Sequence, residues 1–192
     1  MENCDHIVVL GSTLTALAII RAAKTLGLNC TLVDTKRGIA FDSRHQTPIY
    51  CPSATEEDLL QQLKKVASKA RTALIAENDA WLRFIVRHRQ ALQSMFASIL
   101  HPNSRSIELC LDKSLFLDWC KDKGFAAPRH YGLEAASKLL PSEESPLLLR
   151  PETTRHDLGK SVPKAIEVRS RVELDRWLTH FAAAGVKPSI AE

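Results

Sequence analysis

Residues 6–34 read HIVVLGSTLTALAIIRAAKTLGLNCTLVD, and this stretch decides the fold of the first half of the chain. A short apolar run, residues 6–10, ends at Gly11 and is typical of a buried strand that leads into a turn. Apolar residues at helical spacing follow as far as Gly27, which stands where a helix C-cap glycine belongs. Residues 30–34 read as a second strand. Strand, helix and strand within forty residues predict a βαβ unit with a right-handed crossover.

The same alternation continues to about residue 100. An acidic first turn after Thr55 predicts a helix, residues 73–76 read as a third strand, and a short strand is expected near residues 49–50. A long helix over residues 79–99 is predicted from apolar residues at helical spacing, namely Trp81, Ile85, Leu92, Phe96 and Ile99. Residues 1–104 are therefore predicted to form an α/β domain with an open parallel sheet.

The pattern changes near residues 101–104, where we place the domain boundary. Asp112 is expected to cap a helix that runs to Lys123, with one apolar face made by Leu115, Phe116, Trp119 and Cys120. Strands are predicted near residues 147–150 and 164–168, and a capping box precedes a further helix, at Ser170, Arg171, Val172 and Glu173. Residues 105–192 are therefore predicted to form a smaller α+β domain.

Composition excludes several classes of protein. The chain has 192 residues, of which 45% are apolar and 25% charged, so it is neither disordered nor fibrous. Its longest apolar runs are far shorter than the roughly 20 residues that span a bilayer, and no signal peptide is visible, so we expect a cytoplasmic protein without a membrane partner. The net charge of +4 is spread along the chain, which disfavours nucleic acid as a partner.

The turn after the first strand is the first candidate site. Gly11, Ser12 and Thr13 lie between a strand and a helix, the usual context of a phosphate-binding turn. A dinucleotide fingerprint needs two further glycines here, so NAD binding is disfavoured, although Asp34 follows the second strand as a ribose-binding acid would. We interpret the turn, together with Asp79, as a possible binding site for a small substrate at the strand ends.

Cations in the second half form the other candidate site. Lys113 begins a helix, Arg150 ends a strand, and Lys160 and Lys164 flank the start of the next strand. Each lysine alone is more typical of a solvated surface charge. Arg150 differs because it directly follows three leucines and is expected to be partly buried, where an unpaired charge is costly. Convergent cations of this kind are suited to phosphate groups.

The order of several short motifs resembles the ATP-grasp superfamily, in particular its carboxylate–amine ligase-like members, which include D-aspartate ligase-like and carbamoyl-phosphate-synthase-like proteins. The later motifs resemble the first ATP-grasp subdomain, and the earlier ones resemble the Rossmann-like pre-ATP-grasp domain. The later motifs are Asp112-Lys113, GFAAP at residues 124–128, PLLLRP at 146–151, KAIEV at 164–168 and SRVEL at 170–174. The earlier motifs are AEND at residues 76–79 and SRH at 43–45.

This resemblance implies ATP-dependent amide formation through an acyl phosphate, with a small carboxylate and an amine as the other substrates. It implies that Lys113 and Arg150 hold the ATP phosphates. Lys164, at the start of the next strand, is expected to join them because a helix start, a strand end and the next strand start can converge on one edge of a cleft. The loop of residues 152–161 then covers the triphosphate with His156 and Lys160, and Glu192 stands at the adenine-binding hinge. The Mg²⁺ ligands are expected beyond residue 192, so the chain resembles the N-terminal portion of a longer ligase. No catalytic residue is identified within it.

Two alternatives stay open at this point. One is a Rossmann-like module that binds NAD or another nucleotide without catalysis, although a single glycine in the turn disfavours it. The other is an oligomerisation module, such as a homodimer, in which the first domain and the helix over residues 79–99 build an interface. An exposed apolar patch on that helix would favour the second alternative.

The five cysteines are predicted to bind no metal and to form no disulfide, because they are widely spaced and no CxxC pair occurs. Cys4 and His6 lie two residues apart, yet two ligands are too few for a structural zinc. Elemental analysis should find no stoichiometric metal, and mass spectrometry without reductant should find five thiols. A bound metal or a mass loss from disulfide formation would contradict this prediction.

Overall fold

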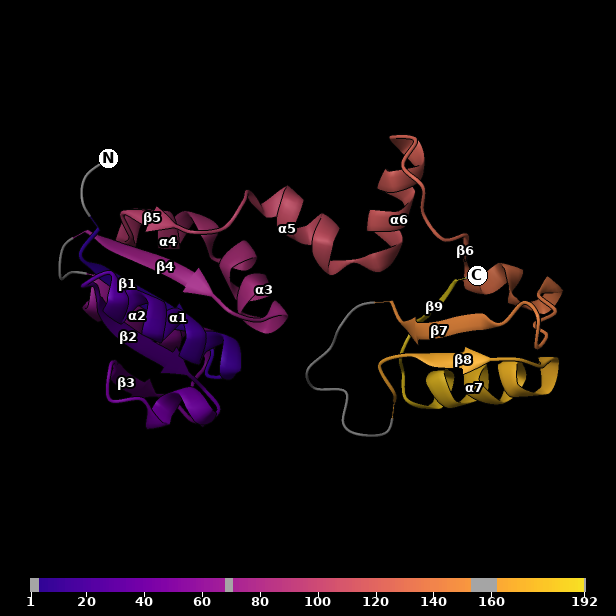
Figure 1. Cartoon of the computed structure of the whole chain (residues 1–192), viewed down its shortest axis with the longest axis horizontal. Coiled ribbons are helices and arrows are strands. Elements are labelled where there is room, and N and C mark those ends of the chain that lie inside the picture. Colours follow the sequence, from indigo (N-terminus) through magenta and orange to yellow (C-terminus); the bar gives the residue numbers. More distant parts are fainter. Residues whose placement is uncertain (1–3, 68–70, 153–161, 192) are drawn as a thin grey trace. The chain divides into compact units, whose positions relative to one another are not determined.

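The computed structural model describes residues 4–67, 71–152 and 162–191. The chain divides into two compact units, Met1–Ile107 and Glu108–Glu192 (Figure 1). Helix α5 (Ser104–Leu111) contains this division, and it begins at the last residue of the first predicted domain. Within the described ranges, no helix has the length and apolar character needed to cross a membrane.

The first unit contains a five-stranded sheet in the order β3-β2-β1-β4-β5, with every neighbouring pair parallel. Its central strand β1 is buried along its whole length, as expected for a parallel sheet covered on both faces. The predicted α/β fold of this half is confirmed. The strands are β1 (His6–Leu10), β2 (Asn29–Asp34), β3 (Thr47–Tyr50), β4 (Thr72–Ala76) and β5 (Ser98–Ile99).

Helices cover both faces of this sheet. Because successive side chains of a strand point to opposite faces, β1 supplies Ile7 and Val9 to one apolar core and Val8 and Leu10 to the other. The first core lies under α1, and the second lies under α2, α3 and α4. The helices are α1 (Leu14–Thr25), the 3₁₀ helix η1 (Ile39–Asp42), α2 (Glu56–Ala67), α3 (Asp79–Arg87) and α4 (Arg89–Met95).

The long helix predicted over residues 79–99 is wrong. The chain forms α3, breaks at His88, forms α4 and then becomes extended at Phe96, where ψ is 141°. The last residues pair with β4 as the short strand β5, with Ile99 opposite Leu74. The apolar residues that suggested one helix instead contact the core of their own unit. Trp81, Phe84, Ile85, Leu92 and Phe96 are all buried there.

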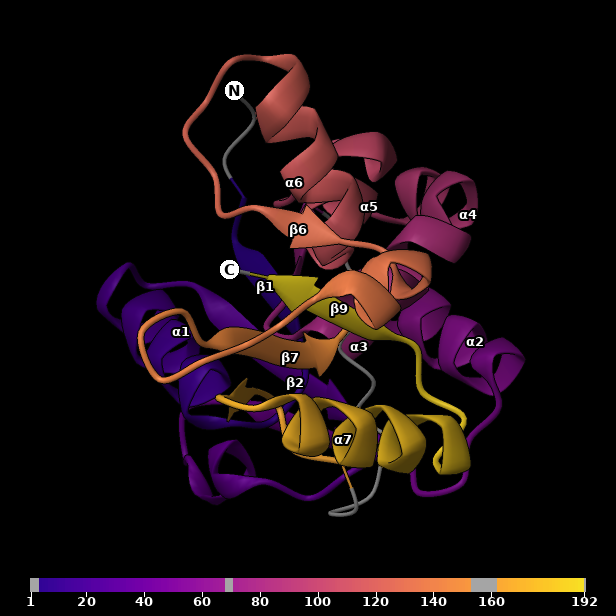
Figure 2. The same cartoon turned by 90° about the vertical axis from the view of Figure 1, so that its right-hand side faces the viewer.

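The second unit contains a four-stranded sheet in the order β6-β9-β7-β8, and its neighbouring strands are antiparallel. Helix α7 packs on one face of this sheet (Figure 2). The core between them contains Leu149, Ile190 and Leu174. The elements are α6 (Lys113–Asp122), β6 (His130–Tyr131), the 3₁₀ helix η2 (Leu133–Lys138), β7 (Leu147–Pro151), β8 (Ile166–Val168), α7 (Arg171–Ala183) and β9 (Pro188–Ala191).

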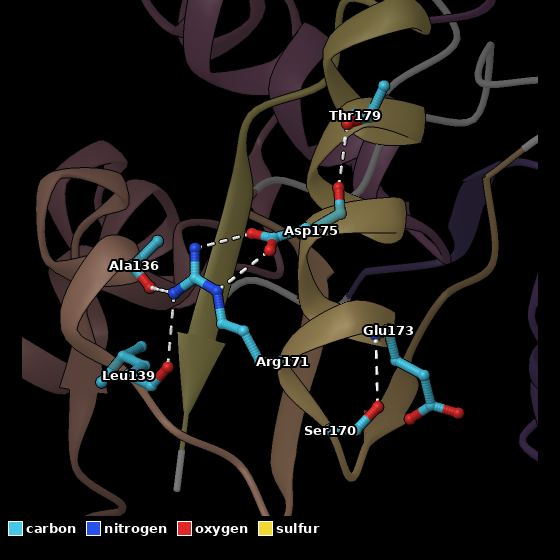
Figure 3. Close-up of polar contacts among 7 residues, drawn as sticks. All are labelled: Ala136, Leu139, Ser170, Arg171, Glu173, Asp175 and Thr179. Carbon is cyan, nitrogen blue, oxygen red and sulfur yellow. Dashed lines mark hydrogen bonds and ion pairs between the residues drawn. The ribbon is translucent and has the colours of Figure 1, made fainter.

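The start of α7 ties together two parts of the second unit (Figure 3). Ser170 caps the helix, since its Oγ accepts a hydrogen bond from the Glu173 backbone N–H, as the capping box predicts. The Arg171 guanidinium donates to both carboxylate oxygens of Asp175. It also donates to the backbone carbonyl of Ala136 at 2.7 Å, and this bond fixes η2 against the helix. One side chain therefore holds two elements that are far apart in the sequence.

The apolar face predicted for α6 is also wrong. Leu115, Phe116 and Trp119 are 53%, 41% and 37% exposed, whereas Leu117 and Cys120 are the buried residues of this helix. The aromatic rings stack on one another instead of on the sheet, and Trp119 lies 5.6 Å from the ring of Phe125. The helical period was correct, but the side of the helix that the unit buries was not.

We predict that acid destabilises the first unit through His101. Its Nε2 accepts a hydrogen bond of 2.7 Å from the backbone N–H of Ala76, at the end of β4, so the ring must be neutral. Burial lowers the pKa of His101 below its ordinary value of 6.5, and the charge of Arg89 lowers it further. The folded state disfavours the protonated ring of His101. The stability that the neutral ring contributes is therefore fully present above about pH 6.5, and it is lost as the pH falls through the lowered pKa.

The measurement is urea unfolding of the wild type and of His101→Gln between pH 5 and pH 8. Glutamine can accept the same bond but does not titrate, so the wild type should lose about 1 kcal/mol relative to the variant as the pH falls. A constant difference between the two proteins across this range would contradict the prediction.

Candidate functional site

The carboxyl ends of β1, β2 and β4 meet at one edge of the first sheet. After β1 the chain returns on one side as β2 and β3, whereas β4 and β5 lie on the other side of β1. The gap between the ends of β1 and β4 is therefore a topological switch point, the usual ligand-binding position in an open parallel sheet. The turn after β1 and the residues after β4 line this position.

Gly11 makes the turn after β1 possible. Its φ is +104°, a conformation that L side chains rarely adopt, and its N–H donates to the Val33 carbonyl at 3.0 Å. A Cβ atom at this position would lie 2.2 Å from Glu77 Oε1. The missing side chain therefore allows the Glu77 carboxylate to lie directly over the turn.

Ser12 and Asp34 form a buried polar pair beside this turn. The Ser12 hydroxyl donates to Asp34 Oδ2 at 2.6 Å, and it accepts from the Gly38 N–H at 2.9 Å. The other carboxylate oxygen, Asp34 Oδ1, accepts from the Thr35 N–H at 2.7 Å and from the indole N–H of Trp81 at 3.3 Å. Both carboxylate oxygens of Asp34 thus already accept hydrogen bonds within the fold, which leaves Asp34 poorly suited to bind a ribose.

Glu77 and Asn78, which follow β4, form the accessible part of this edge. Glu77 Oε2 accepts a hydrogen bond from the Thr13 hydroxyl, and Glu77 Oε1 accepts from Asn78 Nδ2 at 2.7 Å. The Asn78 side-chain oxygen caps α3, which Asp79 begins. A partly exposed carboxylate held by neutral donors can still accept a hydrogen bond from an N–H or ammonium group of a small molecule.

The four sequence-predicted substrate residues therefore lie at one edge of the sheet, in different roles. Gly11 shapes the turn, Ser12 is buried against Asp34, Thr13 orients Glu77, and Asp79 begins the next helix. Sequence reasoning did not select Glu77, although an acidic residue directly after a buried parallel strand is the signal that could have found it. We name Glu77, Thr13 and Asn78 the carboxylate cluster.

The second candidate site lies on the face of the second sheet opposite α7. Leu149 and Ile190 are paired across β7 and β9 and point into the core, so the next pair, Arg150 and Ser189, points to the other face. Arg150 Nε and Ser189 Oγ are both buried and have no hydrogen-bond partner within the described residues. Buried polar atoms are nearly always paired in folded proteins, so this pair needs a partner from outside the described chain.

The start of α6 lies beside the same end of β7. The backbone N–H of Lys113 donates to the Glu152 carbonyl at 3.4 Å. The Glu152 carboxylate accepts from the Ser114 hydroxyl at 3.2 Å and from Lys187 Nζ at 3.0 Å. Glu152, which lies two residues after Arg150 in the chain, thus links the first turn of α6 to the end of β7 and the start of β9.

Lys164 lies near the same end of the sheet. It is exposed and stands two residues before β8, whose Ile166 pairs with Leu149 of β7. The structure therefore places Lys113, Arg150 and Lys164 at one end of three neighbouring elements. The other predicted nucleotide-binding residues, His156, Lys160 and Glu192, lie outside the described residues.

The described residues offer no fit for the implied Mg²⁺. Among them, no group of three or more His, Cys, Asp or Glu side chains could hold a metal ion. Glu152, two residues after Arg150 in the sequence, already accepts from Ser114 and Lys187. No chemical step is therefore assigned to a metal within this part of the chain.

The fold is similar to the N-terminal half of several solved enzymes, and no protein-family model or curated protein matches the sequence. An ADP complex of N5-carboxyaminoimidazole ribonucleotide synthetase matches with a TM-score of 0.73 and 15% identity, over 100% of this chain and 47% of that chain. The L-amino acid ligase from Bacillus licheniformis matches with a TM-score of 0.72 and 14% identity, over 100% and 44%. The biotin carboxylase domain of the Hydrogenobacter thermophilus 2-oxoglutarate carboxylase matches with a TM-score of 0.65 and 18% identity, over 98% and 44%.

At these identities the similarity shows the fold alone, and the chain spans about half the length of the structures it matches. The predicted fold class is confirmed: a Rossmann-like unit with a parallel sheet is followed by a smaller α+β unit with an antiparallel sheet.

We predict that Gly11→Ala disrupts the carboxylate cluster, with Gly27→Ala as the matched control. Gly27 also has a positive φ, +73°, but nothing lies within 4 Å of its added Cβ. Gly27→Ala should cost about 1 kcal/mol of unfolding free energy from the left-handed backbone alone. Gly11→Ala should cost at least about 1 kcal/mol more, because Glu77 must give up its bond with Thr13. Equal losses in urea unfolding would show that Glu77 does not lie over the turn.

Proposed function

We propose that this chain supplies the N-terminal portion of an ATP-dependent carboxylate–amine ligase. Support comes from the order of the ATP-grasp-like motifs and from a fold shared with ligases and carboxylases, one of them solved with ADP and another with MgADP. In this proposal the second unit binds the nucleotide phosphates, and the carboxylate cluster of the first unit binds a small substrate.

The observation that carries the nucleotide proposal is the unpartnered pair of Arg150 Nε and Ser189 Oγ. A phosphate oxygen can accept a hydrogen bond from each of them and satisfy both buried groups. Lys113 and Lys164, at the same end of the sheet, add positive charge for the rest of the triphosphate. Arginine suits this position because its guanidinium presents several donors in a fixed plane. His156 and Lys160 would cover the phosphates, and Glu192 would stand at the adenine.

The proposed reaction has two steps. A carboxylate oxygen of the substrate attacks the γ-phosphorus of ATP, the bond to the β–γ bridging oxygen breaks, and ADP leaves. The amine nitrogen then attacks the acyl carbon of the acyl phosphate, phosphate departs with the bonding electrons, and the nitrogen loses a proton. Arg150, Lys113 and Lys164 neutralise the charge that spreads over the transferring group, which is the main contribution that protein side chains make to phosphoryl transfer.

In the first unit, the carboxylate cluster would position the amine. Glu77 accepts from Thr13 and Asn78, which fixes the direction of its carboxylate toward the switch point. An ammonium or amino group of a substrate can donate to the same carboxylate. Mg²⁺, when bound, would neutralise phosphate charge through ligands other than the described residues.

Nucleotide binding by the first unit without catalysis is the weaker candidate. The Glu77 carboxylate lies over Gly11, where the pyrophosphate of a dinucleotide would need to approach, and like charges repel. Asp34, the expected ribose partner, is occupied by Ser12 and by the Trp81 indole. An oligomerisation role is also not favoured, because the apolar side chains that suggested it are buried in their own unit.

The proposal predicts where Mg-ATP binds. In a ¹⁵N amide NMR titration, saturable shifts should appear at Arg150, Ser189 and Lys113. Arg150→Ala should weaken binding about tenfold or more, since a charge-assisted bond to phosphate contributes about 1.5–3 kcal/mol. Arg176→Ala removes an exposed arginine of the same unit and should leave binding unchanged.

Shifts confined to Gly11, Ser12 and Thr13 would contradict the proposal and favour a Rossmann-like nucleotide site in the first unit. Equal weakening by Arg150→Ala and Arg176→Ala would indicate a response to overall charge and would remove Arg150 from the site.

A further inference from the structure

A cavity of the first unit lies at the sheet edge opposite the carboxylate cluster. It has a volume of about 610 Å³ and is lined by residues at the amino ends of three neighbouring strands. His6 begins β1, Asn29 begins β2 and Thr47 begins β3, and all three strands are parallel. A volume of this size lies within the usual range of small-molecule sites. The proposed ligase reaction does not use this edge.

The wall of this cavity contains a buried polar pair. His6 and Thr31 are only 9% and 5% exposed, and His6 Nε2 lies 2.9 Å from Thr31 Oγ1. Both residues lie on strands whose other side chains are mostly apolar. Burying polar groups in such a sheet costs free energy, so the pair gives this cavity a polar, preorganised side.

The rim of the cavity is positively charged. Lys24 stands in the last turn of α1, and Arg44 and His45 stand just before β3. Within the described residues neither Lys24 nor Arg44 has an ion-pair partner. Asp5 is the one acid among the described residues that line the cavity, and its charge is offset by Arg71 at 3.4 Å. Two cations from separate segments, Lys24 and Arg44, thus line one cavity, and neither forms an ion pair within the described residues.

We infer that this cavity binds a small phosphate-bearing anion, held by Arg44 and Lys24 and bounded by the His6–Thr31 pair. The arginine can donate two parallel hydrogen bonds to phosphate oxygens, and the lysine adds a second charge from α1. The carbonyl end of α1 also faces this edge, so side chains and not the helix dipole must hold the anion. The site is separate from the proposed nucleotide site and does not depend on it.

The test is a titration of the chain with inorganic phosphate, followed by amide and imidazole NMR signals, with sodium chloride of equal ionic strength as the blank. Saturable shifts are expected at His45, Thr47 and Asn29. Arg44→Gln and Lys24→Gln should each weaken binding about tenfold. Lys64→Gln removes an exposed cation of α2 and should change nothing. All replaced residues are exposed, and an unchanged amide spectrum would show that each variant folds.

Three outcomes would overturn the inference. These are shifts that do not saturate, equal weakening by Lys64→Gln, and saturable shifts confined to Arg150 and Ser189. The last outcome would leave the proposed nucleotide site intact while removing the anion site in the first unit. Conversely, phosphate binding at Arg44 without any response to Mg-ATP at Arg150 would support the anion site and contradict the proposed function.

Discussion

The close approach of Glu77 to a glycine is the constraint on which the first candidate site depends. Strands β1 and β4 are hydrogen-bonded neighbours, so the residues that follow them must share the space at their ends. A side chain at position 11 would occupy the volume that Glu77 fills. Glycine at this position therefore does more than allow a tight turn, because it places a carboxylate at the switch point of the sheet. The same carboxylate disfavours an anion there.

In the sheet of the second unit, successive side chains along each strand point to opposite faces. Leu149 and Ile190 contact α7, and the adjacent pair, Arg150 and Ser189, points the other way. A charged residue one position after a core leucine is stable only if its polar atoms find partners. The unpartnered atoms of this pair, with Lys113 held nearby through Glu152, are the observations on which we base the proposed anion site at this face.

Much of the fold could be predicted from the sequence because buried parallel strands read as short apolar runs. The strands around Val8, Leu32 and Leu74 were found in this way. The end of the helical segment before residue 98 could not be found, because β5 exists only through pairing with β4, a contact between distant residues. The helical spacing of apolar residues predicted α6, but it did not show which face of the helix is buried. Glu77 and Ser189 were missed as site residues, since their partners depend on sheet neighbours and register.

The most direct test of the central claim is a crystal structure of the chain with Mg·ADP. The claim is that the second unit holds the nucleotide and the first unit does not. We predict electron density for the diphosphate within hydrogen-bond distance of Arg150 and Ser189, with Lys113 nearby, and no nucleotide at the turn after β1. A diphosphate bound at Gly11, with Glu77 displaced from the turn, would contradict it.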